Sequence, residues 1–288
     1  SSRDTPPVST YTNATDSTAP CQGDLMADVR DVSTLQVRST MSVVSEPTLC
    51  WVIRTNDGLL VEPVREFVAE MAANGTSPAT RRSYCHDLLR WLRFCEAIET
   101  TWDRANTEDV RDFVRWLRAA PNSQRVRSGK ESRPPAGSVN AATGKTYLRE
   151  GQSPRTINHA LSVLSAFYTF MYETGRGPWS PVPAPQRRRD HLPTRRVRYR
   201  QKVPIFQPRS VTEAALKDLF EVLRHDRDRA LVAVALSSGV RAGELLSMTT
   251  RGVDAGQGVF AIEPKGGLGS RIWVPAAPES FVWIARYL

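Results

Sequence analysis

The feature that most constrains the fold is a helical spacing of apolar residues, which recurs in four segments before residue 176. Apolar side chains return every three or four positions, so each segment places them on one face of a helix. Two segments open with the same start signal, Ser77-Pro78 and Ser153-Pro154, in which a capping hydroxyl precedes a proline at the first helical position. The pattern predicts a small domain of four helices over residues 57–177.

Three other stretches lack this spacing. Residues 1–56 are rich in Ser, Thr, Asp and Pro, and we expect them to be mostly disordered, with a short ordered piece near 48–54. Residues 121–152 predict a long basic loop inside the helical domain, because Gly, Pro, Ser, Lys and Arg dominate them. Residues 178–208 predict a semi-rigid linker rich in Pro and Arg. A second folded domain is expected over residues 209–288.

The second domain is predicted to combine helices with a pair of strands. The capping-box pattern Ser210-Val211-Thr212-Glu213 starts a helix. Asp226 is expected to cap the next helix, which is apolar on all sides between Ala230 and Leu236 and is therefore expected to be buried. Gly239 is expected to end it. The other expected elements are a short helix at 241–248, strands at 259–262 and 271–274, and a helix from Pro278 onward. The fold class predicted for the chain is mainly α.

The positive charge of the chain is concentrated in two of the irregular stretches. The formal net charge is +9. Residues 121–152 hold 6 basic and 2 acidic side chains, and residues 186–202 hold 8 basic and 1 acidic. Charge that gathers in a loop and a linker between neutral folded parts is typical of a protein that wraps a polyanion such as nucleic acid. The alternative is a solvated linker that only keeps the protein soluble.

The composition argues against membrane, secreted and zinc-finger classes. The longest apolar run, Ala230–Leu236, is far shorter than a membrane span, and the N-terminus has no secretory pattern. The 4 cysteines form no Cys-x-x-Cys pair, and no histidine stands at zinc-finger spacing from them. We therefore expect reduced thiols, no metal site and a cytoplasmic location. Because the first residue is Ser1 rather than Met, we expect a processed, tagged or excerpted chain.

Three residues in the second domain form a candidate phosphate site. Arg241 and Glu244 stand one helical turn apart after the glycine break, and Lys265 stands on the expected hairpin. A guanidinium suits the non-bridging oxygens of a phosphodiester, and an ammonium on a hairpin can deliver a proton to a leaving oxygen. Each has an ordinary alternative, since Arg241 and Glu244 could form a surface ion pair and Lys265 could be a simple turn lysine.

The order of these motifs resembles the tyrosine recombinase (phage integrase) family. Residues 210–288 are similar to the first part of its α+β catalytic domain. They contain Asp-Arg-Ala-Leu at 228–231, Gly-Val-Arg-Ala-Gly-Glu-Leu-Leu at 239–246 and Lys-Gly-Gly at 265–267. Residues 58–176 look like its SAM-like helical core-binding domain, through Ser-Pro-Ala-Thr at 77–80 and Pro-Arg-Thr-Ile-Asn at 154–158.

The resemblance implies a reaction and a role for each candidate residue. In this family a tyrosine attacks a DNA phosphodiester and forms a 3′-phosphotyrosyl link, without a metal or nucleotide cofactor. Arg241 would be the first active-site arginine, Glu244 the supporting acid and Lys265 the general acid. The implied partners are double-stranded DNA and further copies of the chain in a tetrameric synapse, with no membrane. The implied location is the bacterial cytoplasm, in association with the nucleoid.

The chain also departs from the family pattern. The His-x-x-Arg box is absent, because none of the 4 histidines is followed three residues later by arginine; they are His86, His159, His191 and His225. Tyr287 comes too early in the family order to be the nucleophile, so we interpret it as a core or surface tyrosine. We therefore expect a C-terminally incomplete chain with only part of the catalytic domain, which is inactive by itself.

The expected DNA contacts are cations of the helical domain and the linker. They are Arg81, Arg82, Arg155, Arg187, Arg188, Arg189, Arg195, Arg196, Arg198, Arg200 and Lys202. Two other functions stay open at this point. One is a non-catalytic DNA-binding protein that occupies recombination sites, and the other is a protein-interaction module whose basic linker is incidental.

Overall fold

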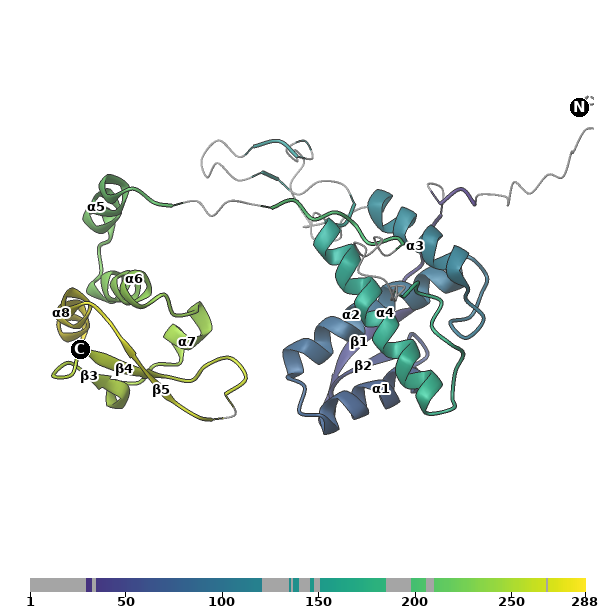
Figure 1. Cartoon of the computed structure of the whole chain (residues 1–288), viewed down its shortest axis with the longest axis horizontal. Coiled ribbons are helices and arrows are strands. Elements are labelled where there is room, and N and C mark those ends of the chain that lie inside the picture. Colours follow the sequence, from purple (N-terminus) through teal and green to yellow (C-terminus); the bar gives the residue numbers. More distant parts are fainter. Residues whose placement is uncertain are drawn as a thin grey trace, which may run out of the picture. The chain divides into compact units, whose positions relative to one another are not determined.

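The computed structural model describes residues 30–32, 35–120, 135, 137–139, 146–147, 151–184, 198–205, 210–267 and 269–288. The chain divides into two compact units, one with residues 1–44, 53–67 and 84–201 and the other with residues 45–52, 68–83 and 202–288, so that a boundary after the fourth helix lies between Gln201 and Lys202. Figure 1 shows the order of the elements, with two strands and four helices before this boundary and four helices and a small sheet after it. Each part is described by itself.

A two-stranded sheet precedes the helices, with β1 at Met41–Glu46 and β2 at Cys50–Thr55. Val52 and Ile53 are buried, and the Glu46 carboxylate closes the turn by accepting from the backbone N–H of Leu49 at 2.6 Å. The prediction that residues 1–56 are mostly disordered is therefore wrong for residues 41–55, although the short ordered piece expected near 48–54 overlaps β2. The sequence did not reveal the two-stranded sheet because the strands do not alternate strictly and the turn lacks an Asn-Gly or Asp-Gly pair. Residues 1–29 lie outside the described residues.

The first four helices are α1 at Glu62–Ala73, α2 at Pro78–Ala97, α3 at Thr107–Ala119 and α4 at Pro154–Glu173. Both predicted start signals are confirmed. Ser77 Oγ accepts from the N–H of Thr80 at 3.3 Å, and Ser153 Oγ accepts from the N–H of Thr156 at 3.2 Å. The cap of α3 is Asn106, which forms a capping box with Asp109.

Aromatic side chains from α2, α3 and α4 form the core of the helical part. The Trp91 and Phe113 rings meet edge to face at 5.1 Å, and both are fully buried. Trp91 Nε1 donates to the Tyr168 hydroxyl at 3.1 Å, and that hydroxyl donates to the carbonyl of Trp102. Burial raises the pKa of Tyr168 far above its ordinary value. Tyr168 is therefore a neutral, hydrogen-bonded core residue and not a candidate nucleophile.

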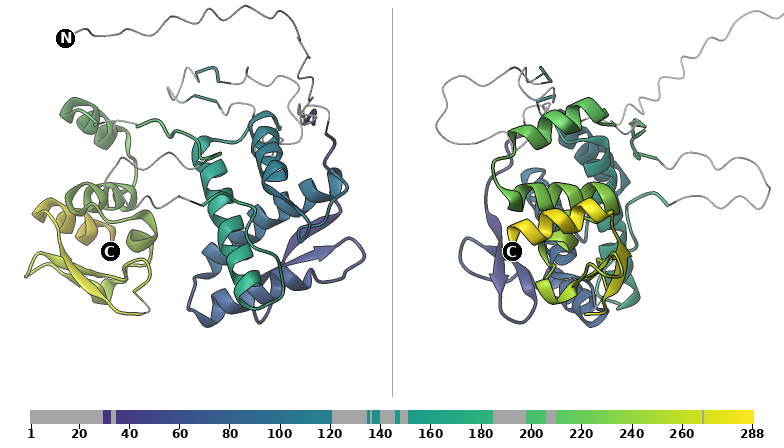
Figure 2. Two further views of the ribbon diagram at one scale, coloured as in Figure 1. Left: turned by 45° about the vertical axis from the view of Figure 1, so that its right-hand side comes forward. Right: turned by 90° about the vertical axis from the view of Figure 1, so that its left-hand side faces the viewer.

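The C-terminal part combines four helices with a three-stranded antiparallel sheet of order β3-β4-β5. In the sheet, Phe260 of β4 stands opposite Val274 of β5. The core joins Val234, Phe260 and Phe281, one each from α6, β4 and α8. Figure 2 shows α6 and α8 side by side. The element bounds are α5 Glu213–Val222, α6 Asp226–Ser238, α7 Ala242–Leu246, β3 Val253–Asp254, β4 Val259–Ile262, β5 Ile272–Pro275 and α8 Pro278–Tyr287, with a short 3-10 helix at Thr250–Gly252.

Helix α6 is less buried than the sequence predicts. Ala230, Ala233 and Val234 are buried, whereas Leu236 is 53% exposed. The reason is that α7, α8 and β4 pack against one side of α6 only. Gly239 ends the helix as predicted, in the left-handed conformation.

Two predicted caps in the C-terminal part are wrong by one or two residues. The cap of α5 is Thr212 and not Ser210, because the Thr212 hydroxyl accepts from the N–H of Ala215 at 3.3 Å. Asp226 lies in the first turn of α6 and does not cap it. The predicted domain limits 57–177 and 209–288 stay predictions, and most of the predicted basic loop 121–152 lies outside the described residues.

Among the described residues, none of the helices has both the length and the apolar composition that crossing a membrane requires.

Candidate active site

Glu244 lies at the centre of the candidate active site, on the short helix α7. Arg241 is the N-cap residue of this helix. The backbone N–H of Arg241 donates to Glu244 Oε2 at 2.8 Å, and Arg241 Nη1 donates to Glu244 Oε1 at 2.9 Å. The two residues that the sequence pairs by spacing are therefore joined by both a backbone and a side-chain hydrogen bond.

Lys265 reaches the same carboxylate through its backbone. Its N–H donates to Glu244 Oε1 at 3.2 Å, although the two residues are 21 positions apart. Lys265 is the second residue of a turn between β4 and β5, which the N–H of Gly267 closes on the carbonyl of Pro264 at 2.8 Å. Gly266 supplies the left-handed φ of +84° that this turn requires. Glu244 therefore fixes the position of the lysine turn relative to α7.

Of the paired side chains, Glu244 is buried and Arg241 is exposed to solvent. The Glu244 side chain is 7% exposed, whereas that of Arg241 is 71% exposed. The hydrogen bonds from the backbone and the guanidinium of Arg241 hold the pKa of Glu244 below its ordinary value of 4.5. The carboxylate is therefore ionised at neutral pH, and it orients Arg241 while the guanidinium stays open to solvent.

Arg241 and Lys265 keep donors that a ligand can use. A guanidinium has five N–H donors, and the ion pair with Glu244 engages Arg241 through Nη1. The Lys265 side chain is exposed, and within the described residues no hydrogen bond or ion pair engages its ammonium. A guanidinium held along one edge presents its other donors in a fixed direction, which suits the non-bridging oxygens of a phosphodiester. The catalytic roles of Arg241, Glu244 and Lys265 stay predictions.

The predicted DNA contact at Arg81 does not fit the structure. Its side chain is buried, with 8% exposure for the residue, and its Nη2 lies 3.7 Å from the Cys50 sulfur. The physical reason is helical periodicity, since Arg81 stands four residues before Cys85 on the buried face of α2. A cation in that position supports the fold and is not available to a phosphate.

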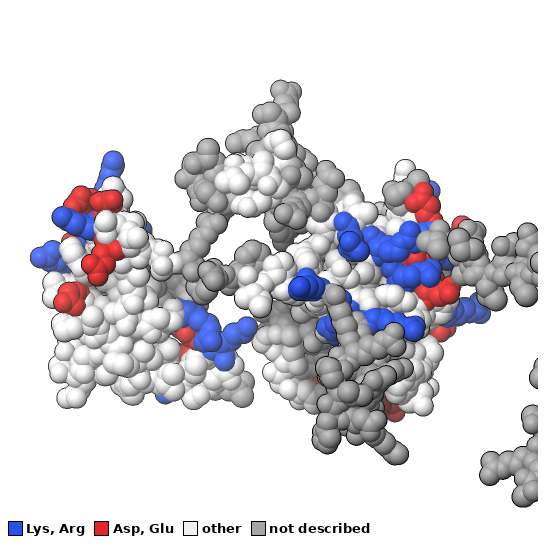
Figure 3. All heavy atoms as spheres, turned by 45° about the horizontal axis from the view of Figure 1, so that its top comes forward, with Lys and Arg blue, Asp and Glu red and all other residues white. Residues whose placement is uncertain are grey.

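The other predicted DNA contacts have several environments. Arg82 is exposed and lies over the Trp51 ring at 4.6 Å, and Arg155 is exposed in the first turn of α4. Arg198 and Lys202 are exposed, and Arg200 is partly buried. Figure 3 shows that basic side chains gather in patches on the surface. The remaining five lie outside the described residues: Arg187, Arg188, Arg189, Arg195 and Arg196.

The sequence analysis missed a charged cluster between α2 and α4. Asp87 is buried, and its two oxygens lie 2.5 Å from Arg90 Nη1 and 2.6 Å from His159 Nδ1. Burial raises the pKa of Asp87, and Arg90 and the hydrogen bond with His159 offset part of that effect. The sequence signal for this cluster was an aspartate between the apolar positions 85 and 88 of a helix. A carboxylate buried at such a position requires a partner.

No metal centre is present in the part of the chain that the structure describes. There, no group of three or more His, Cys, Asp or Glu side chains is arranged to hold a metal ion.

Comparisons with known proteins point to one family. The family model for "Phage integrase, N-terminal SAM-like domain" matches residues 64–128. The tyrosine recombinase XerD of Xanthomonas axonopodis pv. citri is 31% identical over 148 residues, which cover 49% of this chain and 43% of the relative. The tyrosine recombinase XerC of Chlorobaculum parvum is 28% identical over 228 residues, covering 68% and 54%. These matches support a member of the tyrosine recombinase and phage integrase family.

The chain is also similar to Transposase A from transposon Tn554 of Staphylococcus aureus. It is 24% identical over 219 residues, which cover 72% of this chain and 55% of the relative. The chain spans about half the length of the curated relatives it matches. The predicted fold class is confirmed, because the α-rich structure and the SAM-like match agree with the helical core-binding domain of a tyrosine recombinase.

Proposed function

We propose that the chain is part of a site-specific DNA recombinase that breaks and rejoins duplex DNA through a 3′-phosphotyrosyl intermediate. The observation that carries the proposal is the group around Glu244. One buried carboxylate holds both an exposed arginine and the turn that bears an exposed lysine. The named activities of the XerC, XerD and transposase relatives support this function, and they do not favour a non-catalytic role.

In the proposed reaction, each of the three residues has a separate task. A tyrosine oxygen attacks phosphorus, a new P–O bond forms to the tyrosine, and the bond from phosphorus to the 5′ oxygen breaks. Arg241 binds the non-bridging oxygens and stabilises the charge that develops on them. Lys265 gives its proton to the 5′ oxygen as that oxygen leaves. Glu244 touches no reacting atom in this scheme and acts as a positioning residue. None of the tasks requires a metal or a nucleotide.

The proposal takes the nucleophile from outside residues 1–288. Tyr287 is exposed near the end of α8 and lines a cavity of about 290 Å³ with Arg227 and Leu246. Arg241, Glu244 and Lys265 do not line this cavity. Strand exchange also requires more than one active site on the DNA, so we propose that several copies assemble there, in association with the bacterial nucleoid.

Covalent trapping tests the assigned roles, in a longer form of the chain that carries the nucleophile. A nicked duplex that loses its short 5′-hydroxyl strand after cleavage traps the covalent complex. Arg241→Ala should abolish trapping, whereas Arg251→Ala, which removes an exposed arginine of the 3-10 helix, should leave it unchanged. Equal trapping by the Arg241→Ala variant and the unaltered protein would refute the role of Arg241.

The role of Lys265 has a sharper test, because a general acid is needed only for a poor leaving group. Lys265→Ala should slow cleavage of an ordinary phosphodiester by about 100-fold or more. The same variant should cleave a substrate with sulfur in place of the 5′ bridging oxygen at nearly the rate of the unaltered protein, since a thiolate leaves without a proton. An equal defect on both substrates would show that Lys265 is not the acid.

A further inference from the structure

The chain after the predicted linker returns to helix α4, where one side chain holds it. Asn158 Nδ2 donates to the carbonyl of Gln201 at 2.9 Å, and Asn158 Oδ1 accepts from the N–H of Gln201 at 2.7 Å. The side-chain amide thus satisfies both backbone groups of one residue, as a neighbouring β-strand does. We name this pair of hydrogen bonds, between residues 43 positions apart, the Asn158 clasp.

Contacts on either side of the clasp fix the same segment. Arg200 Nη1 donates to the backbone carbonyl of Asn158 at 3.0 Å, and Gln201 Nε2 donates to the carbonyl of Tyr199 at 2.6 Å. Tyr199 has a φ of +68°, a left-handed conformation that costs energy for a residue with a side chain. Such a conformation persists only where surrounding contacts enforce it, so residues 199–201 are a folded part of the helical unit.

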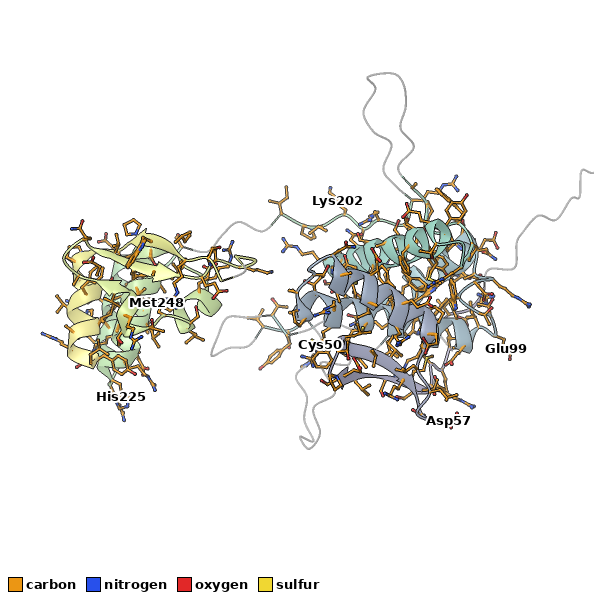
Figure 4. The ribbon with its side chains drawn as sticks, turned by 90° about the horizontal axis from the view of Figure 1, so that it is seen from below. Cys50, Asp57, Glu99, Lys202, His225 and Met248 are labelled. Carbon is orange, nitrogen blue, oxygen red and sulfur yellow. The ribbon has the colours of Figure 1, made fainter. Side chains whose placement is uncertain are left out.

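The clasp lies among polar and cationic side chains of the first turns of α4 and of residues 198–202. Arg155 stands three residues before Asn158 and is exposed. His159 follows Asn158, its side chain is 46% exposed, and its Nδ1 is held by the buried Asp87. Arg198 and Arg200 come from the clasped segment, and Figure 4 marks Lys202 in the stretch that continues from it. The carboxylate of Asp87, which His159 contacts, is buried.

We propose that Asn158 is a positioning residue that makes the end of the linker a fixed part of a cationic surface on the helical unit. The partner that fits this surface is the sugar-phosphate backbone of duplex DNA, because several cations at fixed positions match a regular array of phosphates. The clasp itself stands on geometry alone. The assignment of duplex DNA as the partner rests on the proposed function. One measurement tests the clasp, and a separate measurement tests DNA binding.

Hydrogen exchange at the Gln201 amide tests the clasp without DNA. In the 288-residue protein, Asn158→Ala should speed this exchange by about tenfold or more, because the N–H loses its acceptor. Asn158→Asp keeps that acceptor oxygen and should retain much of the protection. The matched control is Ser162→Ala, which removes a hydroxyl that bonds the same Asn158 carbonyl from within α4. Equal protection in Asn158→Ala and the unaltered protein would overturn the clasp.

Duplex DNA binding tests the surface. Asn158→Ala should weaken binding by roughly fivefold to tenfold, since the linker cations are no longer held in place before binding. It should also lower the slope of log affinity against log salt by about one for each phosphate that the variant no longer binds. Ser162→Ala should change neither quantity. Faster Gln201 exchange with unchanged DNA affinity would overturn the surface role, and failure of the unaltered protein to bind DNA at low salt would refute the proposed function itself.

Discussion

At the scale of single residues, Glu244 makes the most connections in the candidate active site. Its two oxygens accept three hydrogen bonds, two from Arg241 and one from the backbone of Lys265. A carboxylate can do this because both oxygens are acceptors, whereas an amide has only one acceptor oxygen. Replacing the acid with its neutral isostere should therefore disturb α7 and the lysine turn together, although the side chain keeps its shape.

Glu244→Gln should lower the thermal unfolding midpoint at pH 7. It should also make the midpoint fall less steeply as the pH is lowered. The pKa of Glu244 is lowered in the fold, so the carboxylate form stabilises it. That contribution is complete above the ordinary value of 4.5 and is lost as pH falls through the lower folded value. Melting curves of the 288-residue protein between pH 7 and pH 3 measure this effect.

The control for this experiment is Glu221→Gln, on an exposed glutamate of α5. It should change neither the midpoint nor its pH dependence. An identical pH profile for Glu244→Gln and the unaltered protein would contradict the assigned hydrogen bonds.

Some single-residue contacts could be predicted from the sequence and others could not. Arg241 and Glu244 are three residues apart, so helical geometry alone pairs them. The contacts of Asn158 with Gln201 and of Asp87 with His159 join residues 43 and 72 positions apart. No local pattern encodes such pairs, because they depend on how α4 packs against α2 and where the linker returns.

At the scale of elements, local start and stop signals predicted most helices, and the strands expected at 259–262 and 271–274 match β4 and β5 to within one residue. The Ser-Pro pairs place α2 and α4, and Gly239 ends α6, because each signal acts within one turn of chain. The pairing of β1 with β2 depends on packing of Val52 and Ile53, and only a short ordered piece near 48–54 was expected there. A two-stranded sheet is barely stable alone, so its strands carry little sequence signal of their own.

Helices α2 and α4 are joined through one buried hydroxyl, which gives a test of the helical core. Tyr168→Phe removes the acceptor of the buried Trp91 Nε1 and the donor to the partly buried Trp102 carbonyl. Such a change should cost about 1–3 kcal/mol of unfolding free energy. Urea unfolding followed by tryptophan fluorescence measures it.

The matched control is Tyr172→Phe one turn further along α4, where the tyrosine is exposed. It should change the unfolding free energy by less than about 0.5 kcal/mol. Equal stability of the two variants would show that the Tyr168 hydroxyl does not join the helices.

At the scale of the whole molecule, the two units carry different parts of the proposed function. The helical part matches the SAM-like domain of phage integrases, and the C-terminal part holds Arg241, Glu244 and Lys265. The net charge of +9 and its concentration in the loop and linker were evident from composition. Which cations are free to bind DNA was not evident, since Arg81 is buried. Binding by both parts should make affinity for duplex DNA fall steeply with salt.

The most direct test of the central claim is the salt dependence of duplex DNA binding by the 288-residue protein and its Arg241→Ala variant. Fluorescence anisotropy over a range of salt concentrations gives both affinity and slope. If Arg241 holds a DNA phosphate, its removal should weaken binding severalfold and lower the slope by about one, while Arg251→Ala has a smaller effect. If Arg241→Ala binds with the affinity and slope of the unaltered protein, Arg241 does not hold a phosphate and the proposed active site is wrong.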